Sequence, residues 1–211
     1  MIFKYDGSAN SKKELRVILS EIKAKYGSIN TLTVARMQGI QDGHKRLIDF
    51  HEEIGENNII AIGSCQESGT IQNPFTASQR IEMIRMLKGY DKRSSGKLSI
   101  VKLNDINAVY PNEWKNYVLD KIANWSGNLP TPNVYIGGSE LDIMDNGFHT
   151  DFFAISLERL SSGIMSGTEV RKSIVNGNDE WKNHVPYVIQ DYMIQNFPKE
   201  LTLEYKIKQG V

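Results

Sequence analysis

Short apolar runs alternate with longer amphipathic segments along this chain, and this alternation constrains the fold more than any other feature. Runs with the composition of buried strands occupy residues 31–37, 58–64, 98–103 and 133–136, and residues 151–157 form a further strand or irregular extended chain. Helical spacing of apolar residues occurs at 44–56, 76–88, 113–125, 168–176 and 185–196. The alternation predicts an α/β fold, in which a Rossmann-like parallel sheet carries helices on both faces.

Length and charge limit the classes of protein to which the chain can belong. Its 211 residues fit a single domain with an ordinary core, preceded by an N-terminal extension over residues 1–30. Lys plus Arg and Asp plus Glu both number 25, so the net charge is zero. This balance argues against a nucleic-acid-binding protein that works through a broad basic surface.

The sequence also predicts a soluble, cytoplasmic protein with no membrane partner. The N-terminus lacks the apolar core of a signal peptide, and no apolar run approaches the ~20 residues that a membrane-spanning helix needs. Cys65 is the only cysteine, so no intramolecular disulfide can form. We therefore expect Cys65 to be a buried, reduced thiol.

The two ends of the chain lie outside the alternating pattern. Ser11 and Glu14 predict a capping box at the start of an amphipathic helix, and Gly27 suits the end of that helix. Residues 201–207 alternate in polarity, which predicts an edge strand. We expect both segments to complete the fold or to form an oligomer contact.

Ligands of parallel α/β sheets bind beyond the carboxyl ends of the strands, and residues 35–44 (ARMQGIQDGH) occupy such a position. The strand should end near Met37 and the next helix should begin at His44, whose imidazole can donate a hydrogen bond to a phosphate. Free N–H groups and the dipole at a helix N-terminus attract anions, and Gly43 lets a phosphate approach the backbone. The alternative is an ordinary turn in which Asp42 caps the helix.

A second helix start lies at residues 165–171 (MSGTEVR). Ser166 and Glu169 form a capping-box pattern, which by itself marks only the start of a helix. Thr168 and Arg171 lie near the same end, and hydroxyl, backbone N–H and guanidinium groups together suit a polyphosphate. The alternative is a capped helix on the surface.

These two segments, together with residues that lie between them, match the motifs of one known family. Residues 35–44 correspond to the motif G-R-F-Q-P-x-H-x-G-H, residues 62–84 to I-G-S-A-Q-E-S-x-x-x-x-N-P-F-T-A-x-x-R-I-x-M-I, and residues 165–171 to a motif with the core S-G-T-x-I-R. Asp105, Ile106, Asn107 and Trp114 supply another match. On these motifs the chain resembles the nucleotidylyltransferase superfamily and, within it, the archaeal-type nicotinamide mononucleotide (NMN) adenylyltransferases. The resemblance spans about residues 31–193, so residues 31–211 would form the nucleotidylyltransferase domain.

The resemblance implies a reaction and its partners. The family transfers the adenylyl group of ATP to NMN, forming NAD and pyrophosphate by in-line displacement, without a covalent enzyme intermediate. Mg²⁺ is the implied cofactor and would arrive with ATP, held largely by phosphates and water. The chain carries no H-E-x-x-H or Cys/His ligand set, so we expect no metal site built from protein side chains. The family also implies a homo-oligomer, with a hexamer as the expected form.

The resemblance also assigns roles to residues. The implied catalytic residues, which act on the phosphates, are His44, Arg171 and Arg36. The implied ATP-binding and phosphate-binding residues are Met37, Gln38, Gln41, Gly43, His44, Gly137, Ser139, Ser166, Gly167, Thr168 and Arg171. The implied NMN-binding residues are Gly63, Ser64, Arg80, Asp105, Ile106, Asn107 and Trp114, with Trp114 stacked on the nicotinamide ring.

Some of these residues have simpler alternative roles. Arg80 could form a salt bridge near Glu82, and Trp114 could belong to the core, because it has helical spacing with neighbouring apolar residues. The remaining histidines lie outside the motifs and are expected to be surface or structural residues, namely His51, His149 and His184.

The chain departs from the family pattern in the first loop. Gln41 stands where the motif has its first His, Ala35 where it has Gly, and Gly39 where it has Pro. Gln41 can donate a hydrogen bond but cannot become cationic. Two alternatives therefore stay open: a nucleotidylyltransferase with another phosphate acceptor or with CTP, and a nucleotide-binding regulator without catalysis.

Overall fold

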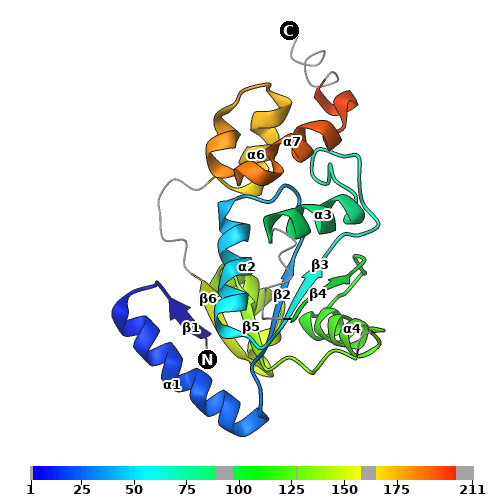
Figure 1. Ribbon diagram of the computed structural model, residues 1–211. Helices are drawn as coiled ribbons and strands as arrows, with labels where there is room; N and C mark the ends of the chain where they lie inside the picture. Colours follow the sequence, from blue (N-terminus) through cyan, green and yellow to red (C-terminus); the bar gives the residue numbers. More distant parts are fainter. Residues whose placement is uncertain (1, 89–96, 127, 158–164, 203–211) are drawn as a thin grey trace.

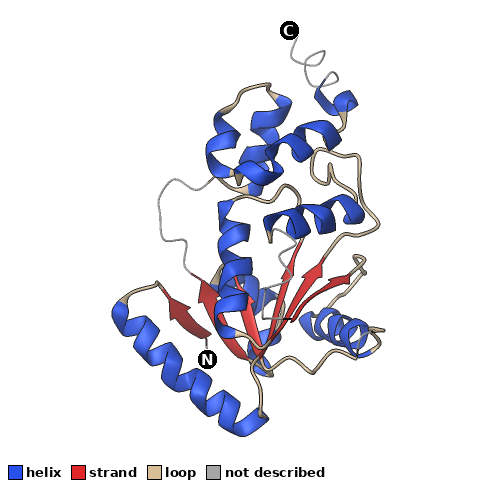
Figure 2. Cartoon of the chain, viewed as in Figure 1, coloured by secondary structure: helices blue, strands red, loops and turns tan. Residues whose placement is uncertain are grey.

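A six-stranded, all-parallel sheet forms the centre of the computed structural model, which describes residues 2–88, 97–126, 128–157 and 165–202 (Figures 1 and 2). The sheet has the strand order β1-β6-β5-β2-β3-β4. The strands are β1 (Ile2–Tyr5), β2 (Asn30–Ala35), β3 (Asn57–Ile62), β4 (Lys97–Lys102), β5 (Val134–Gly137) and β6 (Phe153–Leu157). The predicted Rossmann-like α/β fold in a single domain is thus confirmed.

Helices cover both faces of the sheet, as predicted. They are α1 (Ala9–Tyr26), α2 (Asp42–Ile54), α3 (Ala77–Leu87), α4 (Pro111–Ala123), α5 (Glu140–Asp145), α6 (Gly167–Val175) and α7 (Tyr187–Asn196), with the short 3₁₀ helices η1 (Phe148–Thr150) and η2 (Glu180–His184). Side chains alternate across β3: Ile60 and Ile62 pack in the core beneath α1, α2, α3, α6 and α7, whereas Ile59 and Ala61 pack in the core beneath α4, α5 and η1. This buried, two-sided strand explains the continuous apolar run in the sequence.

The N-terminal segment contributes more than the predicted helix. β1 pairs in parallel with β6, with Ile2 opposite Ala154, and so forms an edge of the sheet. Helix α1 begins at Ala9 with Ser8 as its N-cap, so the predicted capping box at Ser11 and Glu14 is wrong. The Ser11 hydroxyl instead donates to Asp6, which holds the turn before the helix. Gly27 adopts a φ of 79° and ends α1, as predicted.

The predicted edge strand over residues 201–207 is wrong for the two of its residues that the structure describes. Leu201 and Thr202, the first residues of the predicted edge strand, are helical, and the Leu201 N–H donates to the carbonyl oxygen of Pro198. Residues 203–207 lie outside the described part of the chain. By contrast, residues 153–157 form a regular strand, which decides between the two alternatives for that segment.

The strand order reverses between β2 and β5. From β2 the chain adds β3 and β4 on one side, then crosses to place β5 on the other side of β2. Helices that diverge on either side of such a switch point leave a crevice beyond the carboxyl ends of the strands. In Figure 1 the arrowheads of β2 and β3 point toward the end where α3, α6 and α7 lie. No helix among the described residues is long and apolar enough to cross a membrane.

Candidate active site

A cavity of about 540 Å³ lies at this switch point. Its walls come from the ends of β2, β3 and β5 and from the N-terminal turns of α2 and α6. The predicted site residues that line it are Arg36, Met37, Gln38, Gln41, Gly43, His44, Gly63, Ser64, Asp105, Trp114, Gly137, Gly167, Thr168 and Arg171. The structure therefore brings most of the predicted residues, from motifs far apart in sequence, to one place.

Two sharp turns shape the floor of the cavity. Met37 follows β2 with a φ of 53°, and Ser64 follows β3 with a φ of 51°. This left-handed conformation is uncommon for residues with a side chain, and it persists only where the surroundings enforce it. Both turns lie at the carboxyl ends of adjacent strands, where they open the backbone toward the cavity.

Gln38 joins the first loop to the segment before α3. Its side-chain amide donates to the carbonyl oxygen of Phe75 and accepts from the Phe75 N–H, each at 3.1 Å. Its own carbonyl oxygen accepts from Arg171 at 3.0 Å. The Gln38 side chain thus forms hydrogen bonds within the protein, and its role in this structure is to position the loop.

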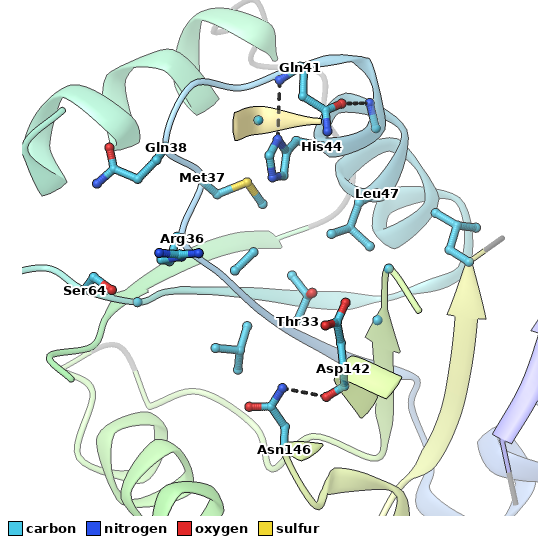
Figure 3. A pocket seen from close by; sticks show the side chains of 18 of the residues that line it. Thr33, Arg36, Met37, Gln38, Gln41, His44, Leu47, Ser64, Asp142 and Asn146 are labelled. Atoms are coloured by element: carbon cyan, nitrogen blue, oxygen red, sulfur yellow. Dashed lines mark hydrogen bonds between the residues drawn. The ribbon is translucent and has the colours of Figure 1, made fainter. Parts of the chain in front are cut away.

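His44 stands in the first turn of α2 and is held by the backbone of Gln41 (Figure 3). The Gln41 side chain caps the helix by accepting from Gly43, and the Gln41 N–H donates to Nδ1 of His44 at 3.4 Å. Because Nδ1 accepts, a neutral His44 carries its proton on Nε2. Helix α2 begins at Asp42, not at His44, and the cap is Gln41, so the alternative in which Asp42 caps the helix is wrong.

Arg171 ties α6 to the loops of the cavity. Its guanidinium donates to the carbonyl oxygens of Ile71 and Gln38 and to the hydroxyl of Thr168, at 3.0, 3.0 and 3.1 Å. Burial, and then the nearby Arg36 guanidinium, lower the pKa of Arg171 from its ordinary value. A lowered pKa marks a charge that lacks full compensation, which an incoming anion would supply.

The N-terminal turns of α2 and α6 approach each other at Gly167. A Cβ atom at this position would lie 3.3 Å from the Arg171 guanidinium and 3.8 Å from Cε1 of His44. The absence of a side chain therefore lets the N-terminal turns of both helices, at the positive ends of their dipoles, face the same space. Ser166 caps α6 as predicted, but its side chain is used by Glu169 and does not line the cavity.

Arg36 and Trp114 also line the cavity. Arg36 follows β2, is exposed, and lines the cavity (Figure 3). Trp114, in α4, is half-buried; its ring lies 5.6 Å from that of Tyr117, and it also lines an adjoining hollow. Trp114 therefore has an accessible surface as well as a core contact.

The structure places Arg80 behind the cavity and not in its wall. Its side chain is fully buried and donates to the carbonyl oxygens of Arg36, Gly63 and Ser64 at 2.6, 2.7 and 3.1 Å. Burial lowers its pKa. The alternative of a salt bridge near Glu82 is wrong, because Arg80 is fully buried and donates to backbone carbonyl oxygens, while Glu82 pairs with Arg85 at 3.5 Å. Arg80 in this structure holds the two strand ends that form the floor.

The other predicted residues lie nearby without lining the main cavity. Ser139 caps α5, and its hydroxyl accepts from the N–H of Asp142. Ile106 lines the adjoining hollow, and Asn107 is exposed and lines neither. Cys65 is partly buried, less than expected, and its thiol contacts the carbonyl oxygen of Ile62.

Sequence reasoning missed polar residues that do line the cavity, among them Thr33, Arg46, Asp142 and Asn146. Asp142 and Asn146 lie one helical turn apart at α5, just after β5. Their i, i+4 spacing beyond Gly137 was a usable signal, since residues so spaced share one helix face.

Comparisons with known proteins identify relatives of this chain. A model of the cytidylyltransferase-like family matches residues 32–119. The nicotinamide-nucleotide adenylyltransferase of Methanococcus vannielii is 33% identical over 165 residues, which cover 77% of this chain and 86% of the relative. That of Thermococcus onnurineus is 32% identical over 165 residues, which cover 77% of this chain and 80% of the relative.

A solved structure shares the fold. It is a bifunctional NMN adenylyltransferase/ADP ribose pyrophosphatase from Francisella tularensis, in complex with AMP and an Mn ion, with a TM-score of 0.60 and 20% identity. The match covers 86% of this chain and 54% of that protein, so this chain spans about half of its length. The sequence relatives carry the assignment: the chain belongs to the nicotinamide-nucleotide adenylyltransferase family and is a nucleotidylyltransferase.

Proposed function

We propose that the protein transfers the adenylyl group of ATP to NMN, which yields NAD and pyrophosphate. One observation carries the proposal: His44, Arg171 and Arg36 meet the N-terminal turns of α2 and α6 around a single cavity that Trp114 also lines. Cationic and N–H donors suit the phosphates of two nucleotides. An indole with an accessible surface suits a flat aromatic base.

The proposed reaction needs charge stabilisation and positioning. A phosphate oxygen of NMN attacks the α-phosphorus of ATP, and the bond from that phosphorus to the pyrophosphate breaks as the new one forms. Negative charge grows on the transferred and leaving phosphates. His44 would donate through Nε2–H, and Arg171 and the positive N-terminal ends of both helices would stabilise the pyrophosphate.

The acceptor would lie on the Trp114 side. Arg36 would hold the NMN phosphate, and the turn at Gly63 and Ser64 would border the mononucleotide. These groups come from β2, β3 and α4, so the fold would bring the two phosphates in line without a covalent intermediate.

Mg²⁺ would accompany ATP and offset charge on its phosphates. The Francisella relative holds AMP with an Mn ion, which supports a divalent cation at the nucleotide. Among the described residues, no group of three or more His, Cys, Asp or Glu side chains is placed to hold a metal. We therefore propose that phosphate and water oxygens supply most of the ligands.

The test is a reaction of the purified protein with ATP, Mg²⁺ and NMN. Formation of NAD, read by a coupled alcohol dehydrogenase assay, together with an equal amount of pyrophosphate is the expected result. No NAD under these conditions would remove the proposal. Light scattering on the same sample would test the expected homo-oligomer.

The departure at Gln41 motivates a second candidate, a nucleotidylyltransferase that uses another acceptor or CTP. Gln41 places a neutral amide where the family motif has an imidazole. This amide also caps α2 by accepting from the Gly43 N–H. Parallel reactions with CTP for ATP, and with phosphopantetheine for NMN, separate the candidates. Activity only with one of these substitutes favours the second candidate; nucleotide binding without turnover favours a regulator.

A further inference from the structure

A second hollow of about 400 Å³ adjoins the cavity beside Trp114. Its wall is formed by the loop before α4, including Val109 and Tyr110, and by the end of α5. It shares Asp105, Trp114 and Asn146 with the main cavity, so a base stacked on Trp114 would have this hollow beside it. The substituent of that base would therefore meet the residues of this hollow.

The charged side chains that line this hollow are all acidic. Among the described residues that line it, Asp105 and Asp145 carry carboxylates, and none is Lys, Arg or His. Asp105 is oriented by neutral donors, the Ser64 hydroxyl at 3.0 Å and the Gln66 amide at 3.1 Å. The guanidinium of Arg80 interacts electrostatically with Asp105, but it is fully buried and does not line the hollow.

Asn146 adds a polar group of fixed orientation. Its side-chain N–H donates to the backbone carbonyl oxygen of Asp142 at 2.6 Å (Figure 3). This bond uses one of the two side-chain N–H groups and fixes the orientation of the amide, whose oxygen can accept a hydrogen bond from a ligand. An amide N–H₂ of a ligand can donate to that oxygen, whereas an ionised carboxylate has no hydrogen to donate to it.

We propose that this hollow reads the charge of the pyridine base, accepting the neutral carboxamide of NMN and rejecting the carboxylate of nicotinate mononucleotide. The inference rests on the proposed function and concerns the same acceptor site. The two acceptors have the same ribose phosphate and differ only in the base substituent. Asp105 and Asp145 repel a carboxylate and leave a carboxamide almost unaffected, and the Asn146 oxygen favours the N–H₂ group.

The test compares kcat/KM for the two mononucleotides in charge variants of Asp145. This residue is exposed on α5, so substitution should preserve the fold. The wild type should favour NMN; Asp145→Asn should lower the ratio of NMN to nicotinate mononucleotide by roughly threefold to fivefold, and Asp145→Lys should lower it further. Asp191→Asn and Asp191→Lys make the same changes on α7, outside both hollows, and should leave the ratio unchanged.

The dependence of this kcat/KM ratio on ionic strength provides a second test of the proposed charge effect. Because the phosphates are identical, the ratio isolates the charge of the base, and it should fall toward one as ionic strength rises to about 0.5 M. A wild type that uses both mononucleotides equally, or a preference that neither Asp145 variant changes, overturns the inference. Those results still show adenylyl transfer, whereas a protein that adenylylates neither acceptor removes the proposed function and the inference with it.

Discussion

The backbone N–H of Gln41 donates to Nδ1 of His44 across 3.4 Å, so that a residue unlike the family motif still sets the tautomer of the motif histidine. Gln41 also caps α2 through its side chain. The backbone contact does not depend on which side chain stands at position 41. The loss of an imidazole there therefore need not disturb the orientation of His44.

His44→Ala should abolish most turnover while the fold is kept. The variant removes one donor to the growing phosphate charge, and loss of such a donor costs roughly 10²- to 10³-fold in kcat. The measurement is kcat for NAD formation, with circular dichroism to confirm the fold. His184→Ala, in η2 and outside the cavity, is the control and should retain full activity. Equal activities of the two variants would exclude His44 from the reaction.

Arg36 and Arg80 should respond in opposite ways to replacement by Ala. Arg80→Ala leaves the carbonyl oxygens of Arg36, Gly63 and Ser64 without their buried donor, and should lower the free energy of unfolding by about 3 kcal/mol or more. Arg36→Ala removes an exposed side chain, so it should change stability by about 0.5 kcal/mol or less but strongly reduce NAD formation.

Urea denaturation and initial rates distinguish these two roles. An Arg80→Ala protein as stable as the wild type would show that its carbonyl contacts are dispensable. An Arg36→Ala protein with normal turnover would remove Arg36 from the site. Either result would reverse the division into a structural and a functional arginine.

Arg171→Lys should raise the KM for ATP by roughly tenfold, although it keeps a positive charge. Lysine cannot reproduce the planar fork that reaches Ile71, Gln38 and Thr168 together, so the charge would be poorly placed. Steady-state kinetics at saturating NMN measure the effect. Arg85→Lys, an exposed change on α3, is the matched control and should leave KM as it is. Unchanged ATP affinity in Arg171→Lys would indicate that only net charge matters.

The sequence predicted many of the residues that line the cavity, but it predicted the edges of the fold less well. The helix starts at residues 35–44 and 165–171 carry local signals, and sheet topology then brings them together at the switch point between β2 and β5. β1 was missed, because a four-residue run interrupted by Lys4 has no periodicity of its own and is a strand only through its pairing with β6.

Tertiary packing also decided which polar residues line the cavity. Asp142 and Asn146 face it because α5 packs closely on β5: a Cβ at Gly137 would lie 2.4 Å from Ile143. The burial of Arg80 likewise depends on the convergence of two strand ends, which helical spacing does not reveal. Sequence identifies chemically suitable residues, and packing selects among them.

His51 provides the last prediction, a loss of stability in mild acid. Its ring is completely buried at the end of α2, and Nδ1 lies 2.7 Å from the Thr31 hydroxyl. That hydroxyl donates to the Asn58 side-chain oxygen at 2.7 Å, so His51 must donate from Nδ1, which leaves Nε2 unprotonated. Among the described residues, Nε2 has no hydrogen-bond partner. Burial lowers the pKa of His51 from 6.5 to about 3.

The direction in which stability changes with pH follows from the protons that the folded and unfolded chains bind. Between pH 6.5 and about 3 the unfolded chain protonates this histidine and the folded chain does not, so stability present above pH 6.5 is lost as the pH falls. The slope approaches about 1.4 kcal/mol per pH unit, or about 2 kcal/mol lost by pH 5. Urea unfolding of wild type and His51→Gln from pH 7 to pH 4 should show a flatter profile for the variant, while His184→Gln should follow the wild type. Parallel profiles for wild type and His51→Gln would show that His51 titrates alike in the folded and unfolded chains.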